Sequence, residues 1–358
     1  MPLQGPRPVQ KGSHDHSPSG GGGGSSGRNN QPTFPKPYEL IPFPRQSPKL
    51  EKPAGHAKFH TDRLHGTLFL TLMVQTAVHV STGTIALGSD VGVRGIPLVK
   101  TMTITPDQKL KIQGSSLKGC IRAMYEAITN STLAVITGRY KQQIPQDRHP
   151  CRKKEQLCPA SQVFGALDWQ GLVEFSDAVA TTIGSSSGSL PALFRPRPDQ
   201  RRDYFQNGKA AGRKFYYSQT EALDAGNRGT PTQQAAKKSA FKTQIHFKNL
   251  TPAELGTLLT VLGQDPKYPM LLKLGGGKPV GLGSIQVTIN KIEQPANIRE
   301  RYSAYEAPES DTLEGEKLTT FIQKQLKATQ GYILLEQLKQ LSSILSPTSL
   351  REPPSGVY

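Results

Sequence analysis

Alternating hydrophobic and polar positions predict strands in the first half of the chain. Residues 65–81 are rich in Leu, Val, Thr and Phe, alternate over much of their length, and form the first strong strand candidate. Residues 83–95 are Gly-rich without a clear period, which predicts a loop. Residues 96–100 and 110–112 predict two short strands, and the turn at residues 105–108 connects them.

Helical spacing first occurs at residues 121–128, which are also good helix formers. Ser115 and Ser116 follow a glycine where a loop would open this helix, and both are plausible N-caps. Lys118 and Arg122 are four residues apart, so they share one face of the first turns. Such a helix start is a good seat for phosphate. The alternative is a capped helix with a solvated basic face.

Further strands and helices are expected after residue 170. Residues 171–178 and 243–249 alternate like strands. A helix then opens with Thr251 as N-cap, Pro252 at its first position and Glu254 completing a capping box. Two strands follow across 271–292, broken by a glycine loop at 275–283, and helices are expected at 318–326 and 333–345.

This order of elements predicts an α+β fold. A ferredoxin-like (RRM-like) unit at residues 56–295 is the natural candidate, with large inserted loops at about 136–165 and 184–240. Residues 1–55, rich in Gly, Pro and Ser, predict a mostly disordered tail, although residues 38–44 could dock in a groove as an extended strip. Residues 296–358 predict a helical C-terminal extension and tail.

The composition indicates a basic protein that binds an anionic partner. The 358 residues carry 44 Lys and Arg against 27 Asp and Glu, a net charge of +17, which favours a polyanion, nucleic acid first and an anionic membrane second. No apolar run approaches the length of a spanning helix, and no apolar signal segment follows the N-terminal Met. Three cysteines suit a reducing cytoplasm. We therefore expect a soluble, cytoplasmic chain without membrane attachment.

The glycine loop, residues 275–283, holds five glycines and Lys278. Its spacing matches neither a dinucleotide fingerprint nor a Walker sequence. What remains is a backbone-rich surface with one cation, suited to a sugar-phosphate chain or to a neighbouring helix. A plain tight hairpin is the alternative.

Two basic segments, residues 139–154 and 184–239, are predicted to be loops. Their cations are interleaved with aromatic residues, a combination that suits single-stranded nucleic acid, because Lys and Arg follow phosphates while Phe and Tyr stack on bases. Solvated charged loops are the alternative. The cations are Arg139, Lys141, Arg148, Arg152, Lys153, Lys154, Arg195, Arg197, Arg201, Arg202, Lys209, Arg213 and Lys214.

Three potential metal ligands lie close together in sequence. His149, Cys151 and Cys158 have a spacing that fits three ligands of a structural zinc site, while Ser161 stands where a fourth cysteine would be expected. Alternatively, the cysteines are small apolar residues. Of the acids, Asp177 is expected to cap a helix or to pair with a structural Arg, and Asp90 is a candidate for acid/base or metal-assisted chemistry or else an exposed turn residue.

Five separated stretches resemble the RAMP superfamily of CRISPR-associated proteins. Residues 114–119 (GSSLKG) with Arg122 resemble its GSSLKGxxR signature, and residues 277–283 (GKPVGLG) resemble its glycine-rich loop. Residues 158–165 (CPASQVFG), with 171–177 after them, are similar to a CPxCRLFG…GRVxFSDA stretch. Residues 212–216 (GRKFY) and 247–256 resemble stretches of type III members.

The resemblance implies a guide-RNA-binding backbone subunit of a type III complex that targets RNA in antiviral defence. Its partners would be the guide RNA, the target RNA, and stacked backbone and large subunits. The ferredoxin-like unit would be the palm of such a subunit, with guide phosphates held at the signature helix and the glycine loop. The inserted segment at 184–239 would supply lid or thumb surfaces. The implied RNA-binding residues are Ser115, Ser116, Lys118, Arg122, Arg213, Lys214, Gly275, Gly276, Gly277, Lys278, Gly281 and Gly283.

Two enzymatic alternatives accompany this resemblance. Many family members cut target RNA with a divalent metal and an Asp two residues before a Pro, but Gly95 occupies that position before Pro97 here. Asp90 with Mg²⁺ is the nearby substitute. A repeat-RNA-processing endoribonuclease is the second alternative, and His79 is the histidine near the end of the first strand. Ser161 in place of a family cysteine puts four-ligand zinc binding in question.

Overall fold

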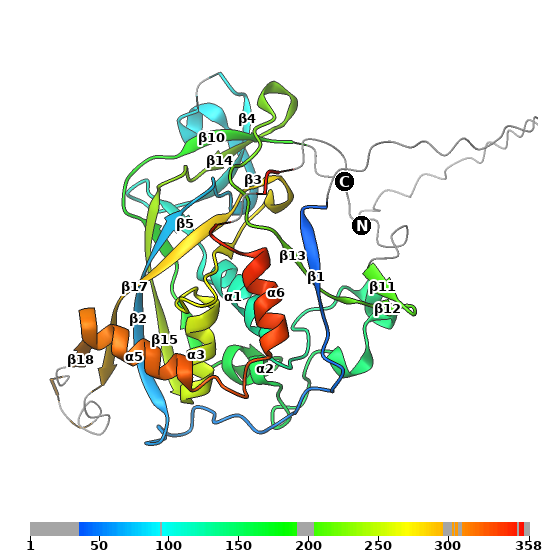
Figure 1. Ribbon diagram of the computed structural model, residues 1–358. Helices are drawn as coiled ribbons and strands as arrows, with labels where there is room; N and C mark the ends of the chain where they lie inside the picture. Colours follow the sequence, from blue (N-terminus) through cyan, green and yellow to red (C-terminus); the bar gives the residue numbers. More distant parts are fainter. Residues whose placement is uncertain are drawn as a thin grey trace, which may run out of the picture. The chain divides into compact units, whose positions relative to one another are not determined.

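The computed structural model describes residues 36–93, 95–191, 204–295, 303, 305–306, 310–348 and 351–353. Its centre is one large mixed sheet, with the main helices gathered on one side (Figure 1). The strands of this sheet are β2 (Leu64–Val74), β3 (Ser81–Leu87), β4 (Leu98–Ile104), β5 (Leu110–Ile112), β8 (Val173–Phe175), β9 (Ala178–Ala180), β10 (Ser186–Leu190), β14 (Thr230–Gln234), β15 (Ala240–Leu250), β16 (Leu272–Lys273), β17 (Ser284–Pro295) and β18 (Ser310–Leu313).

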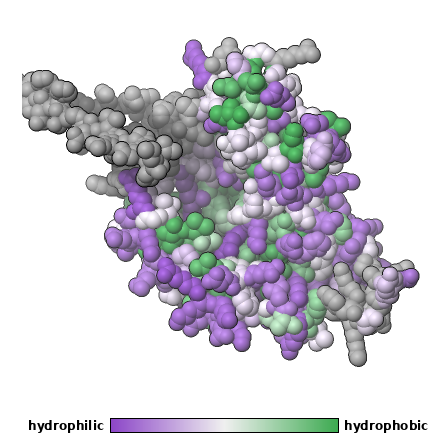
Figure 2. All heavy atoms as spheres, turned by 180° about the vertical axis from the view of Figure 1, so that it is seen from behind, coloured by the Kyte–Doolittle hydropathy of each residue, from purple (hydrophilic) through white to green (hydrophobic). Residues whose placement is uncertain are grey.

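The strand order along the sheet is β10-β14-β4-β5-β9-β15-β2-β17-β16. The long central strands β15, β2 and β17 run antiparallel, whereas β14 and β4 are parallel. Alternate residues of β2, from Leu68 to Val74, are buried beneath the helices, which explains the alternation in the sequence. The side of the sheet away from the helices is mainly hydrophilic (Figure 2). The predicted α+β class is therefore confirmed.

The first predicted strand is interrupted. Instead of running through residues 65–81, β2 ends at Val74 and β3 begins at Ser81. The backbone between them turns to the glycine loop, because the carbonyls of Ala77 and His79 accept hydrogen bonds from Gly283 and Gly276 at 2.9 and 2.8 Å. Alternation alone could not locate this break.

Five helices and five short 3₁₀ turns occur in the described residues. Helix α1 packs against α2, α3 and α6, and α5 packs against α3. The helices are α1 (Gly114–Ile128), α2 (Pro159–Phe164), α3 (Pro252–Val261), α5 (Gly315–Lys327) and α6 (Leu335–Ile344). The 3₁₀ turns are η1 (Gly88–Val91), η2 (Gly138–Gln143), η3 (Gln146–Arg148), η6 (Gly226–Arg228) and η7 (Lys278–Val280). No helix among the described residues has the length and apolar character needed to cross a membrane.

The two central helices begin differently. Thr251 and Glu254 form the predicted capping box of α3, with Glu254 N–H donating to Thr251 Oγ1 and Thr251 N–H to Glu254 Oε2. The serine caps predicted for α1 are wrong, because this helix starts at Gly114. Asp177 caps α1 instead, accepting the Gly114 N–H at 2.7 Å while it pairs with Lys111 at 2.8 Å.

The N-terminal segment joins the fold earlier than predicted. Strand β1 (Tyr38–Pro42) pairs antiparallel with β13 (Gly212–Tyr216), which confirms docking as an extended strip. The buried Arg148 then donates to the carbonyls of Pro44 and Gln46 at 2.7 and 2.6 Å. The predicted tail boundary at residue 55 is therefore wrong for residues 36–55, while residues 1–35 lie outside the described part.

The segment predicted as a loop at 184–239 contains strands. Strands β10 and β14 extend the large sheet, and β13 pairs with β1. Within the segment, β11 (Phe205–Gln206) also pairs with β12 (Lys209–Ala210), and before the segment β6 (Gly165–Ala166) pairs with β7 (Trp169–Gln170). The predicted loop is thus wrong at these strands, whereas the residues between them are turns and irregular backbone. Four of its cations, Arg195, Arg197, Arg201 and Arg202, lie outside the described residues.

Candidate nucleic-acid interface

A pocket of about 440 Å³ lies where three distant stretches of the sequence meet. The first turns of α1, strand β13 and the residues around the start of the glycine loop form its walls. Three lysines are among the lining residues, so the pocket suits an anion. Its lining residues are Ser115, Ser116, Gly119, Cys120, Ala123, Met124, Lys214, Phe215, Tyr216, Lys273, Leu274, Gly275, Lys278 and Leu345.

The pocket unites five of the sequence-predicted RNA-binding residues: Ser115, Ser116, Lys214, Gly275 and Lys278. They come from three segments that are well separated in the sequence, at residues 115–116, 214 and 275–278. The structure therefore gives the separate motifs one common location.

Lys118 points to another environment. Its Nζ lies 3.5 Å from the carbonyl oxygen of Val173, the first residue of β8. Burial lowers the pKa of Lys118, and the nearby Arg122 lowers it further. This residue is thus not part of the pocket wall, although its motif neighbours Ser115 and Ser116 are.

Arg122 and Arg213 make structural ion pairs in this fold, and their RNA contacts stay a prediction. Both pair with the buried carboxylate of Glu126, at 2.8 Å for Arg122 and 2.7 Å for Arg213. The side chains of Arg122 and Arg213 are 16% and 9% exposed. Burial raises the pKa of Glu126, and the two guanidinium groups oppose that rise.

Further donors of these two guanidinium groups also bind inside the protein. Arg122 donates to the carbonyl of Gly165 at 2.8 Å and to Ser161 Oγ at 3.1 Å. Arg213 donates to the carbonyls of Ser131 and Thr132, both at 3.0 Å. These contacts use three of the five N–H donors of each guanidinium group and fix both side chains in the fold.

The glycines of the loop allow the protein's own backbone to pack closely. Gly275, Gly281 and Gly283 have φ angles of +82°, +97° and +92°. A Cβ built on Gly281 would overlap the carbonyl oxygen of Glu221, and one built on Gly275 would overlap that of His79. Close packing and positive φ are enough to explain why glycine occupies these positions, without the RNA contacts that the sequence predicts. A Cβ built on Gly283 would likewise overlap the carbonyl oxygen of Leu274. Gly276 and Gly277 are not among the residues that line the pocket.

Lys273 is a pocket residue that sequence reasoning missed. Its Nζ is buried and donates to the carbonyl of Gly281 and to Ser284 Oγ, both at 3.1 Å. Burial lowers its pKa to about 7, and the charge of Lys278 acts in the same direction. A lone lysine inside the apolar run at 270–274 was the available signal.

The buried Lys273 predicts a pH-dependent stability. Between about pH 7 and the ordinary lysine pKa of about 10.4, the unfolded chain binds a proton that the folded chain lacks. The free energy of unfolding should therefore rise with pH by up to about 1.4 kcal/mol per pH unit relative to Lys273→Met. Urea unfolding across this range measures the difference. Parallel curves for wild type and Lys273→Met would contradict the prediction, and Lys317→Met, at an exposed site on α5, is the control.

Two of the predicted zinc ligands lie beside Thr132. Cys151 and Cys158 Sγ lie 3.5 and 3.2 Å from Thr132 Oγ1, and the Cys158 N–H donates to Cys151 Sγ at 3.3 Å. The hydrogen bond from Cys151 holds the pKa of Cys158 well below its usual range and raises that of Cys151. Within the described ranges, no group of three or more His, Cys, Asp or Glu residues is arranged to hold a metal. Zinc binding by His149, Cys151 and Cys158 stays a prediction.

Asp90 lies in the exposed turn η1, where Ser89 Oγ donates to its carboxylate at 3.3 Å. It shares no metal-binding group with other acids or histidines of the described chain. His79 is buried and bonds the Gln233 carbonyl at 2.7 Å.

Comparisons with known proteins match this chain to one protein family and to solved structures. The family model described as the RAMP superfamily matches residues 71–286. Among solved structures, the chain is similar to one in "Cryo-EM structure of the Type III-B Cmr-beta bound to cognate target RNA", with 15% identity and a TM-score of 0.33. That likeness is distant and covers 64% of this chain and 60% of the other. No curated protein matches.

Proposed function

Because the chain belongs to the RAMP superfamily, we propose that it is a guide-RNA-binding backbone subunit of a type III CRISPR effector complex. In this role it would act in the cytoplasm, in antiviral defence, by holding guide RNA that pairs with target RNA. The type III assignment rests on the GRKFY stretch at 212–216 and the stretch at 247–256. Stacked backbone subunits and a large subunit would be its protein partners.

The observation that carries this proposal is the lysine-lined pocket. Lys214 and Lys278 bring cations to it from β13 and η7, Ser115 and Ser116 add hydroxyl groups from α1, and the buried Lys273 of β16 lies behind the glycine loop. Lysines follow phosphates without reading bases, which suits a guide of any sequence. Pairing between guide and target would then supply sequence specificity.

The arrangement of the central strands supports a ferredoxin-like palm. Strands β9, β15, β2 and β17 are antiparallel neighbours in that order. Helix α1 lies between β2 and β9 in the chain, and α3 lies between β15 and β17. This is the β-α-β-β-α-β sequence of a ferredoxin-like unit, in which two helices share one face.

Replacing Lys278 with Gln should weaken binding to short single-stranded RNA of every sequence. If Lys278 neutralises one phosphate, the slope of log K against log salt should fall by about 0.7. Fluorescence anisotropy over a salt series measures both quantities. Lys317→Gln, on the exposed face of α5, is the matched control and should bind like wild type. Equal slopes for Lys278→Gln and wild type would contradict a phosphate contact here.

The guide role itself is tested by sequencing the RNA that co-purifies with the full chain from its host. Short RNAs of one length class, each with a constant repeat-derived tag and a variable spacer, are expected. Heterogeneous RNA, or none, would overturn the guide role and leave a general basic RNA-binding protein.

No cleavage activity is proposed. The exposed Asp90 stands apart from other acids in the described residues, and His79 is buried against a backbone carbonyl. Slicing of target RNA with Asp90 and Mg²⁺, and processing of repeat RNA, stay the two enzymatic alternatives.

A further inference from the structure

Three tyrosine rings surround one pocket lysine. The Nζ of Lys214 lies 4.0 Å from the ring centroid of Tyr38, 4.7 Å from that of Tyr216 and 5.4 Å from that of Tyr204. It also donates to the Tyr204 hydroxyl at 3.0 Å. Lys214 and the rings of Tyr38, Tyr204 and Tyr216 form the Lys214 cluster. A cation over aromatic faces is attracted by their negative charge density, so the cluster holds the ammonium group in a defined place.

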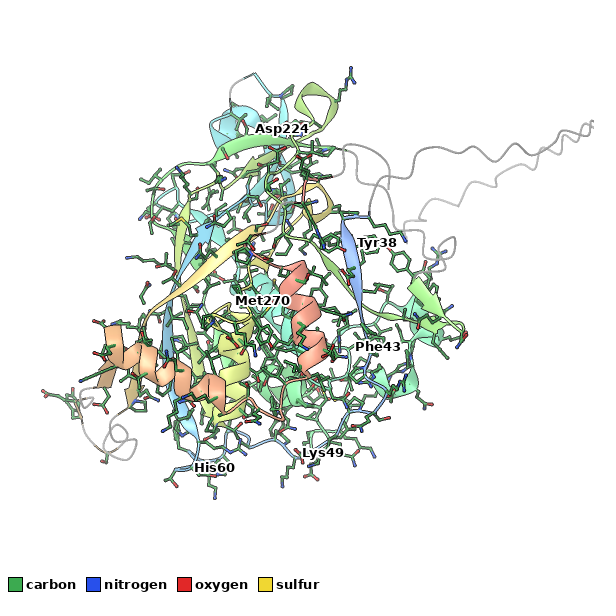
Figure 3. All side chains as sticks on the ribbon, viewed as in Figure 1. Tyr38, Phe43, Lys49, His60, Asp224 and Met270 are labelled. Carbon is green, nitrogen blue, oxygen red and sulfur yellow. The ribbon has the colours of Figure 1, made fainter. Side chains whose placement is uncertain are left out.

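The pairing of β1 with β13 builds this cluster. Its register sets Tyr38 opposite Tyr216, and Lys214 is the next residue on the same face of β13. Tyr38 stacks on Tyr204 with centroids 5.7 Å apart and meets Tyr216 edge-on at 6.0 Å. Tyr38 lies at one end of β1, and Phe43 follows the other end (Figure 3). There Phe43 contacts the guanidinium groups of Arg148 and Arg213.

Two members of the cluster also line the lysine-lined pocket. Lys214 supplies a cation and Tyr216 an aromatic ring, both from β13, and Lys278 of η7 adds a second cation to the pocket lining. A pocket that bound free phosphate would need the cations alone. A ring beside the cations matches a ligand that has a planar group next to its phosphate.

We propose that the Lys214 cluster is a base-stacking subsite, in which one nucleotide of single-stranded RNA places its base on the Tyr216 ring. Its phosphate is then held by Lys214 and Lys278. This inference rests on the proposed RNA-binding function and adds to it that the pocket requires a base as well as a phosphate. Stacking accepts any base, so the subsite tolerates every guide sequence.

The subsite is tested with the full chain and two short single-stranded RNAs, one with all its bases and one with abasic positions throughout. Tyr216→Leu should weaken binding of the complete RNA by about 5- to 150-fold, the range for loss of one stacked base. Both proteins should bind the abasic RNA equally. Tyr216→Phe keeps the ring and should match wild type for both RNAs. Tyr305→Leu, at a fully exposed ring, is the control.

The outcomes separate this inference from the function on which it rests. If wild type binds the complete RNA and Tyr216→Leu binds it equally well, the base-stacking subsite is overturned while RNA binding stands. If Tyr216→Leu weakens both RNAs by the same factor, the ring acts only on the fold or on phosphate contacts, and stacking is again overturned. If wild type binds neither RNA, the proposed function fails.

Discussion

Replacing Glu126 with Ala should lower the free energy of unfolding by about 3–5 kcal/mol, the range for breaking a buried ion pair from one side. The carboxylate is the shared partner of Arg122 and Arg213, and its own side chain is 5% exposed. Without it, two guanidinium groups keep their backbone and hydroxyl contacts but lose their counter-charge inside the core. Urea denaturation followed by circular dichroism measures the change.

Glu336→Ala is the matched control for this prediction. Glu336 also pairs with a cation, Lys339, at 2.9 Å, but its side chain is 79% exposed. Exposed pairs contribute at most about 1 kcal/mol, so this variant should remain close to wild type. Similar losses for Glu126→Ala and Glu336→Ala would show that burial does not set the strength of the Glu126 pairs. Glu126→Gln keeps the shape and removes the charge, and should fall between wild type and Glu126→Ala.

Local signals in the sequence were sufficient for the two central helices. The capping box of α3 uses Thr251 and Glu254, three residues apart, and needs no distant partner. The helical spacing of α1 was likewise sufficient to predict that helix. The residue that caps α1 could not be predicted, because Asp177 lies 63 residues from Gly114 and reaches it only through folding.

Distant pairing explains what the sequence could not show about the fold. Strand β13 lies in a stretch rich in charged residues, and its partner β1 is about 170 residues earlier in the chain. Neither strand has strong alternation, because the pair lies outside the large sheet. The predictions of a loop at 184–239 and of a disordered tail were therefore both wrong at these two strands, because each segment is ordered by an element remote in the sequence.

In the candidate site, the sequence indicated the type of each residue but not whether its side chain is buried. The sequence marked Arg122 and Arg213 as basic, but could not reveal that both meet Glu126 in the core. It also could not predict that Lys273 is buried beneath the glycine loop, because this depends on the Gly281 carbonyl and on Ser284. Residue type indicated the chemistry of the pocket, whereas burial decided which cations remain available for a ligand.

Gly281→Ala should destabilise the protein by about 2–6 kcal/mol, combining backbone strain with overpacking. Gly281 has a φ of +97°, and an added Cβ would overlap the Glu221 carbonyl oxygen. The Gly281 carbonyl also accepts hydrogen bonds from Thr76 Oγ1 at 2.7 Å and from Lys273 Nζ at 3.1 Å. A shift of the loop would thus weaken the contacts that satisfy a buried lysine. Chemical denaturation measures the loss.

Gly331→Ala separates the two causes. Gly331 has a similar φ of +80°, but a Cβ there would meet nothing within 4 Å. It should cost only the strain of a left-handed backbone, about 1–2 kcal/mol. Equal costs at Gly281 and Gly331 would mean that the close packing of the glycine loop contributes nothing. A larger cost at Gly281, together with weaker binding of short RNA, would tie that packing to the shape of the lysine-lined pocket. The glycines would then serve the ligand indirectly, by fixing the backbone that carries Lys273 and Lys278.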